Sequence, residues 1–277
     1  MRSAFVSAYT AVLLGMACAG ELLAQNTPNF QYIPGSQDPP LLYYKGQSRF
    51  SLNAVGTASI RDFWEGPVFG GEFRVAHAPT DRFGLVAGVQ HYKLDRIEVS
   101  YTFGGPNPIV EEYRYQGTWN LVELGAGRFK KFRGNWIGEV YGLIGYGNTE
   151  NIFPDGFRTR SNLVSASVQP IIGRASGFFE IAISNRIRFF NLTNIRTTGD
   201  PSNYFVDFDL MLMEQGPFLM WEPSLLLRGG WQRVRLSFQT GFSGDILGGT
   251  PGRLDLTVGL GLCLWLPGKR TQEVPEP

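Results

Sequence analysis

Two aspartates and one histidine are the residues in this chain of 277 whose types could support hydrolysis. Asp207 and Asp209 lie two positions apart, and a carboxylate near an imidazole such as that of His91 can activate water by general base catalysis. No Walker loop, G-x-S-x-G elbow or H-E-x-x-H motif accompanies them. Only two His and two Cys are present, which argues against a metal centre or a disulfide framework. We therefore expect no enzyme, and no catalytic, cofactor-binding or metal site.

A second group of ionisable residues recurs at alternate positions within apolar stretches. Alternate positions of a β-strand point to the same face, so these residues share one face of each predicted strand. Acids and arginines occur there in near-equal numbers, which predicts an ion-pair network. Its members are Glu72, Glu123, Glu139, Glu180, Glu222 and Asp255 with Arg74, Arg186, Arg188, Arg228, Arg233, Arg235 and Arg253.

The elements that carry these charges are predicted to be long amphipathic strands. Residues 253–266 alternate strictly, with one face formed by Leu254, Leu256, Val258, Leu260, Leu262 and Leu264. A length of about a dozen residues exceeds that of an ordinary soluble strand and matches a tilted bilayer crossing. Similar patterns predict ten strands, at residues 49–60, 69–78, 83–94, 115–129, 136–147, 161–173, 178–190, 218–228, 233–244 and 253–266.

The connections between these strands alternate in length. Tight turns are expected at residues 78–81, 130–135, 174–176 and 229–230, and longer connections at 95–114, 148–160, 191–217 and 245–252. Outer-membrane barrels have short periplasmic turns and long outer loops. The predicted fold is therefore all-β, a single antiparallel transmembrane β-barrel of about ten strands, with eight or twelve as alternatives.

Alternating strands could also form a soluble, lipocalin-like barrel, in which the apolar face lines a cavity and the charged face meets water. The polar faces are rich in Gly, Ser and opposite charges and poor in Lys, which favours an apolar face toward lipid and a charged lumen. Aromatic residues near strand ends predict two interfacial girdles. The tight-turn girdle would comprise Phe83, Phe129, Trp136, Trp231 and Trp265, and the other Trp64, Trp119, Tyr146, Phe189, Trp221 and Phe242.

The segments flanking the barrel are predicted from composition. Residues 1–24 combine Arg2, an apolar stretch and small residues, which is typical of a secretory signal peptide. Cys18 follows a weak lipobox-like sequence, so lipidation at this residue is an alternative to cleavage by signal peptidase. We expect residues 25–47 to form a Pro-rich periplasmic segment, residues 48–266 the barrel and residues 267–277 a periplasmic tail.

The function expected for an outer-membrane barrel of this kind is structural or interaction-based. A barrel of about eight strands is just filled by side chains, so the inward charges are expected to plug the lumen. The protein would act through extracellular loops or as a subunit of an envelope complex, and the alternative is a narrow small-solute pore. The predicted loop at residues 191–217 contains an apolar group that could bind a partner protein. Its members are Tyr204, Phe205, Phe208 and Met211.

The expected partners are accordingly outer-membrane lipid, including lipopolysaccharide, and a partner protein of an envelope complex. A net charge of +1 argues against binding to nucleic acid.

Two stretches carry a resemblance to known proteins. Tyr32-Ile33-Pro34, Pro40-Leu41-Leu42 and Lys45-Gly46 form the first, and the tight turn from Ala76 to Leu85 forms the second. They resemble the uncharacterised outer-membrane barrel proteins of Bacteroidota-type bacteria over about the first third of the chain. This resemblance implies an outer-membrane location and no defined activity.

Ten strands with an aspartate pair at the rim also resemble the omptin proteases in outline. Those enzymes use an Asp–His pair, and no Asp lies two residues before a His here. A rim hydrolase is therefore only a second alternative.

Overall fold

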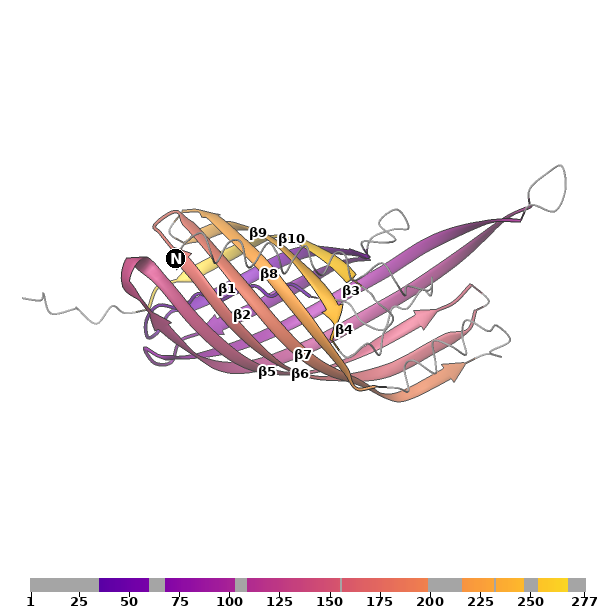
Figure 1. Ribbon diagram of the computed structural model, residues 1–277, viewed down its shortest axis with the longest axis horizontal. Coiled ribbons are helices and arrows are strands. Elements are labelled where there is room, and N and C mark those ends of the chain that lie inside the picture. The colour runs from indigo at the N-terminus through magenta and orange to yellow at the C-terminus, as the bar shows by residue number, and fades with distance from the viewer. Residues whose placement is uncertain are drawn as a thin grey trace, which may run out of the picture.

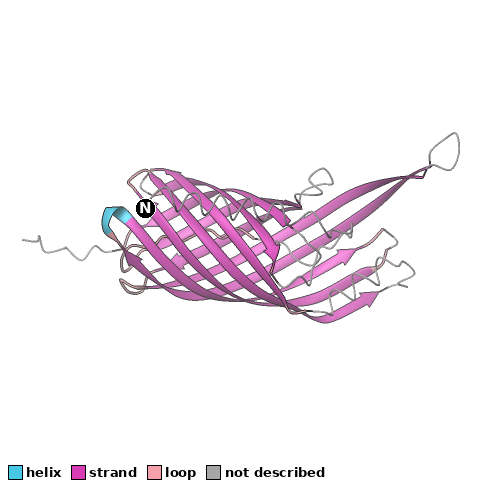
Figure 2. Ribbon diagram, viewed as in Figure 1, coloured by secondary structure: helices cyan, strands magenta, loops and turns pink. Residues whose placement is uncertain are grey.

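The computed structural model describes residues 35–59, 68–102, 109–154, 156–198, 216–231, 233–246 and 254–268. These residues form ten β-strands and one 3-10 turn, Arg133–Asn135, which has neither the length nor the apolar character of a membrane-spanning helix (Figure 2). The strands are β1 (Ser48–Ser59), β2 (Val68–His77), β3 (Phe83–Thr102), β4 (Ile109–Lys131), β5 (Trp136–Ile152), β6 (Arg158–Ala175), β7 (Phe179–Thr198), β8 (Phe218–Gly230), β9 (Val234–Asp245) and β10 (Leu254–Leu266).

The strands close into a single antiparallel barrel in which each strand pairs with its neighbours in sequence (Figure 1). The seam is the pairing of β1 with β10, which runs from Ser48 opposite Leu266 to Ser59 opposite Asp255. The predicted all-β barrel of ten strands is confirmed, and every predicted strand overlaps an observed one. Both ends of the barrel sequence therefore lie at the end that carries the tight turns.

Several strands extend much further than predicted at the opposite end. The ladder between β3 and β4 continues to Thr102 opposite Ile109, and β5 and β6 remain paired to Ile152 opposite Arg158. Most of the connections predicted at 95–114 and 148–160 are therefore strand. Cross-strand hydrogen bonds continue here although the apolar alternation fades. Figure 1 shows the β3–β4 hairpin projecting well beyond the rest of the barrel.

The outer surface of the barrel is apolar over most of its height. Large exposed hydrophobic side chains occur on every strand except β8, whose outward Leu225 and Leu227 are half-buried. On β10, Val258, Leu260, Leu262 and Leu264 point outward and Leu256 is half-buried, while the Leu254 side chain lies outside the described part of the structure.

A row of polar side chains on β3, β4 and β5 interrupts the apolar outer surface. The register places His91, Asn120 and Asn148 side by side, and hydrogen bonds of 2.7 and 2.8 Å join their side chains. Farther from the tight turns the outward face carries exposed ion pairs, Arg114–Asp95 at 2.6 Å and Arg160–Glu150 at 2.8 Å.

The interior consists of an apolar layer at each end with charged side chains between them. Near the tight turns, buried residues such as Ala78, Phe129 and Ile137 form one cluster. Toward the other end, Tyr92, Trp119 and Phe190 belong to a second cluster. The interior therefore contains more apolar side chains than the strand pattern predicted.

This layering corrects the predicted aromatic girdles. Phe129 and Trp119 are buried inside the barrel because they lie on the same face of β4 as Glu123. Trp136, Trp231 and Phe83 are exposed at the tight-turn end, and Tyr146 and Phe189 are exposed farther along their strands. Trp221 and Phe242 are half-buried, and Trp64 lies outside the described residues.

Candidate functional site: the occupied lumen

The charged layer of the lumen contains two clusters, each centred on one glutamate. In the cluster nearer the tight turns, Glu180 receives two hydrogen bonds from Arg49, of 2.8 and 2.7 Å. Arg228 and Arg235 reach the same carboxylate at 3.2 and 2.5 Å. All four side chains are at most 4 % exposed. One buried carboxylate thus neutralises part of the charge of three guanidinium groups.

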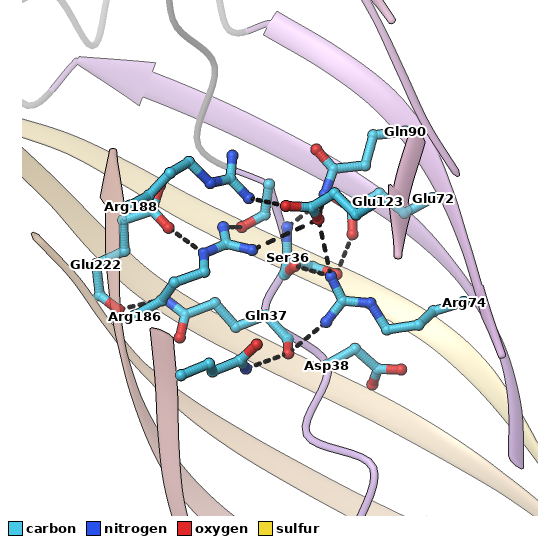
Figure 3. A network of polar contacts seen from close by, with 12 residues as sticks. Ser36, Gln37, Asp38, Glu72, Arg74, Gln90, Glu123, Arg186, Arg188 and Glu222 are labelled. Carbon is cyan, nitrogen blue, oxygen red and sulfur yellow. Dashed lines mark hydrogen bonds and ion pairs between the residues drawn. The ribbon is translucent and has the colours of Figure 1, made fainter. Parts of the chain in front are cut away.

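The second cluster lies deeper in the barrel and is centred on Glu123 (Figure 3). Arg188 lies 2.8 Å, Arg74 3.5 Å and Arg186 3.9 Å from its carboxylate oxygens. Arg186 also donates from Nε to Glu222. Gln90 donates to Glu123 at 3.1 Å. The arginines come from β2 and β7 and the acids from β4 and β8, so the cluster ties opposite walls of the barrel together.

The predicted lumen residues occupy three kinds of position. Buried inside the barrel are Glu72, Arg74, Glu139, Glu180, Arg186, Arg188, Glu222, Arg235 and Asp255, with Glu123 and Arg228. Arg233 is exposed because it lies in the turn before β9 rather than within the strand, which corrects its assignment to the lumen. Arg253 lies outside the described residues. Sequence reasoning missed Arg49, although its place two residues before Ser51 on β1 gives it the same inward face.

Residues 35–47, which we call the lumen segment, belong to the stretch 25–47 that was predicted to lie outside the barrel in the periplasm. The structure places residues 35–42 inside the barrel, whereas Lys45 and Gly46 are exposed and residues 25–34 lie outside the described residues. The C-terminal part of the segment lies at the tight-turn end of the barrel, where the Gly46 N–H donates to the Ala78 carbonyl at 2.7 Å. The segment reaches the deeper charged cluster at Ser36 and Gln37 (Figure 3). Its residues 35–42 are all buried. The physical reason is that side chains of the wall hydrogen-bond to backbone groups along this stretch, from Ser36 to Leu42.

The deeper part of the lumen segment bonds mainly through its backbone. The Ser36 N–H donates to Glu72 at 2.6 Å, and the Ser36 and Tyr92 hydroxyls also donate to Glu72. The Gln37 carbonyl accepts from Arg74 and from Gln169, both at 2.7 Å. Glu72 therefore binds the lumen segment directly.

The next residues of the lumen segment contact the Glu180 cluster and Glu139. Arg228 donates to the Asp38 carboxylate at 2.5 Å and to the Pro39 carbonyl at 2.7 Å. The N–H groups of Leu41 and Leu42 both donate to Glu139, at 3.0 and 2.6 Å. Leu41 has a φ of 49°, a left-handed conformation that is uncommon for a residue with a side chain. Consecutive N–H groups that converge on one carboxylate form the kind of concave donor pair that binds anions.

Two inward-facing glycines make room for the leucines of the lumen segment. A Cβ atom at Gly173 would lie 2.6 Å from Leu41 Cδ2, and a Cβ at Gly84 would lie 2.8 Å from Leu42 Cδ1. Any larger residue would force these side chains to move. The wall of the barrel is therefore shaped to the segment as well as hydrogen-bonded to it.

Aromatic side chains cover the tight-turn end of the charged layer. The Trp265 ring lies 5.8 Å from the Arg49 guanidinium and 5.4 Å from that of Arg235, within the range of cation–π attraction. Tyr43 of the lumen segment lies 5.9 Å from Arg49. Burial raises the pKa of the Tyr43 phenol further above its ordinary value. The Trp265 side chain therefore points into the lumen, and its predicted place in the interfacial girdle at the tight-turn end is wrong.

The structure does not bring the candidate hydrolytic residues together. The exposed His91 belongs to the outward polar row and bonds to Asn120. Asp207 and Asp209 lie outside the described residues, as do Tyr204, Phe205, Phe208 and Met211 of the predicted partner loop. Within the described ranges, no group of three or more His, Cys, Asp and Glu side chains could hold a metal ion.

These observations define the protein as a closed ten-stranded antiparallel β-barrel that holds residues 35–42 in its lumen. No protein-family model and no curated protein matches the sequence. Among solved structures, it is similar to an outer-membrane channel from Pseudomonas putida, with 11% identity over 84% of this chain and 100% of that one, at a TM-score of 0.45.

Two further barrels are similar at the same level. The β domain of the Bordetella autotransporter BrkA shows 10% identity over 80% of this chain and 100% of that one, with a TM-score of 0.41. A major outer membrane protein from Thermus thermophilus shows 12% identity over 79% of this chain and 99% of that one, with a TM-score of 0.38. Likenesses this distant carry no argument about the function of this chain.

Proposed function

We propose that the chain is an integral outer-membrane β-barrel whose lumen is closed to solutes, and that it acts through the surfaces it presents outside the membrane. The apolar outer surface supports membrane insertion. An exposed aliphatic or aromatic side chain such as Leu260, at 62 % exposure, is unfavourable in water and favourable in lipid. Apolar side chains of this kind cover the outside of the barrel nearly all round.

The row of polar side chains on β3, β4 and β5 supports placing the outer surface of the membrane at the level of His91, Asn120 and Asn148. Because charged side chains are costly on the lipid face, the ion pairs Arg114–Asp95 and Arg160–Glu150 would lie in the aqueous phase. The exposed Trp136, Phe179 and Trp231 near the tight turns fit the opposite interface, where aromatic side chains are favoured. On this orientation the tight turns, the start of β1 and the end of β10 are periplasmic, and the strand extensions are extracellular.

The occupied lumen is the single observation that carries the structural or interaction role. Two arginine clusters and the lumen segment fill the charged layer, and an apolar cluster lies on each side of it. A solute would have to displace buried ion pairs to pass. The extended β3–β4 hairpin and its neighbours are then the parts available to a partner.

The test of this proposal is conductance of the purified, detergent-folded protein in planar lipid bilayers. We expect insertion without a steady open level, because buried ion pairs and the lumen segment block the path. Insertion is checked independently by heat-modifiable migration of the reconstituted protein on gels. A stable open level from the unmodified chain would contradict the closed lumen and favour the narrow pore instead.

A further inference from the structure

The barrel wall is complete without the lumen segment. All ten strands pair in one closed ladder, and the seam between β1 and β10 includes no residue before Ser48. Residues 35–42 add no strand to this sheet; they lie within it and contact the wall through side chains of the strands. The segment therefore has the relation to the barrel that a bound ligand has to its receptor.

The contacts of the segment are those with which proteins bind an extended peptide. Wall carboxylates accept backbone N–H groups, with Glu72 bound to Ser36 and Glu139 to Leu41 and Leu42. Wall guanidinium and amide groups donate to backbone carbonyls, as Arg228 does to Pro39. These bonds would be available to any chain with the same backbone path, because they do not depend on the identity of the bound side chains.

Several side chains of the segment add selectivity, among them those of Asp38, Leu41 and Leu42. The Asp38 carboxylate accepts from Arg228 at 2.5 Å and from the Ser51 hydroxyl. Leu41 and Leu42 are fully buried and lie against Gly173 and Gly84. Pro39 and Pro40, which lie between Asp38 and Leu41, restrict the backbone and so reduce the conformational entropy that the peptide loses when it binds.

We propose that the lumen is a binding site for an extended peptide with an acidic residue, a Pro-Pro pair and two adjacent leucines, and that residues 36–42 occupy this site as an internal ligand. An external peptide of the same chemistry would compete for it. Vacating the site would remove the segment's hydrogen bonds to Glu72, Glu139 and Arg228, and water would enter the charged layer. This inference goes beyond the proposed closed barrel and requires only that the barrel folds, not that it lies in the outer membrane.

The test separates the segment from the barrel after folding. A recognition sequence for a site-specific protease is inserted between Lys45 and Gly46, which are both exposed. The full chain is folded in detergent and then cut, which leaves the segment bound without a covalent link. A fluorescent peptide with the sequence of residues 35–44 is added in excess, and its binding is followed by anisotropy.

We expect the cut, folded barrel to take up this peptide, while the uncut protein does not. A peptide with Asp38→Asn should bind about tenfold more weakly, because a charge-assisted hydrogen bond to Arg228 is lost. A peptide with Leu41→Ser and Leu42→Ser should bind at least about 100-fold more weakly, because two buried apolar side chains are lost. Uptake by neither form, or equal binding of all three peptides by the cut barrel, would overturn the proposal.

A second variant provides an independent readout. Residues 36–42 are replaced by Gly and Ser, and the folded protein is inserted into planar bilayers. A steady current that is blocked by the added peptide supports the proposal, whereas a current that the peptide does not affect contradicts it. If this variant does not fold, peptide binding to the cut protein is the measurement that decides between the two outcomes. A failure of membrane insertion would count against the proposed function and would leave the detergent binding result intact.

Discussion

The Glu180→Ala protein is expected to lose at least about 3–5 kcal/mol of folding stability, the cost of breaking a buried ion pair by removing one partner. Arg49, Arg228 and Arg235 all contact this carboxylate, and each is at most 4 % exposed. Without Glu180, three buried guanidinium groups share only Asp38 and more distant acids. Unfolding by denaturant in detergent micelles, followed by tryptophan fluorescence, measures the loss.

Glu150→Ala is the matched control for this prediction. Glu150 also pairs with an arginine, at 2.8 Å, but the Arg160 side chain is 64 % exposed. Because water already solvates this pair, its removal should change stability by less than about 1 kcal/mol. Similar stability losses in both variants would show that the Glu180 cluster does not hold the barrel together.

The Leu260→Arg protein is expected to insert poorly into bilayers, with a cost of about 2–4 kcal/mol for an arginine on the lipid face near the midplane. Leu260 points outward from β10 and pairs with Ala54 and Phe238, midway between the tight turns and the far end of the strand. Folding yield into lipid vesicles, read from heat-modifiable migration, measures the effect.

Ile97→Arg is the matched control, because it places an arginine at an outward position that we expect to lie in water and not in lipid. Ile97 is also an outward aliphatic residue, 56 % exposed, but it lies on the part of β3 beyond the polar row at His91. An arginine there would remain in water, so folding into vesicles should be nearly unchanged. Equal yields for the two arginine variants would refute the assignment of the apolar outer surface to lipid.

The strands of this barrel were predictable because a two-residue period is imposed by strand geometry at every position. Leu256 to Leu264 alternate with inward residues, and the structure has the same alternation. The strand ends were less predictable beyond the polar row. There the apolar pattern fades while cross-strand pairing continues, as it does up to Thr102.

The charged residues of the lumen were predictable by face, but their partners were not. Glu139 and Glu72 accept hydrogen bonds from the lumen segment, which no strand pattern could indicate. Phe129 and Trp119 were misplaced because aromatic residues near strand ends also occur at membrane interfaces. Arg233 was assigned to the lumen because the predicted strand began at residue 233, one residue before the observed start of β9 at Val234.

The lumen segment left a signal in the sequence that composition alone did not resolve. From Asn26 to Tyr44, Asp38 is the single charged residue, whereas a solvated linker is usually rich in charge. Leu41 and Leu42 follow directly after two prolines. Low charge together with these two leucines fits the buried location that the structure shows for residues 35–42.

The position of the lumen segment has a consequence for the order of assembly. The chain leaves the lumen at Gln47 and enters β1 at once, and β1 meets β10 only when the last strand has been made. Asp38 already bonds to Gln239, 201 residues away. Threading the segment into a closed barrel would require passage through a narrow opening. A simpler route is for the nascent sheet to curl around the segment, so that residues 35–42 template the curvature and the seam forms last.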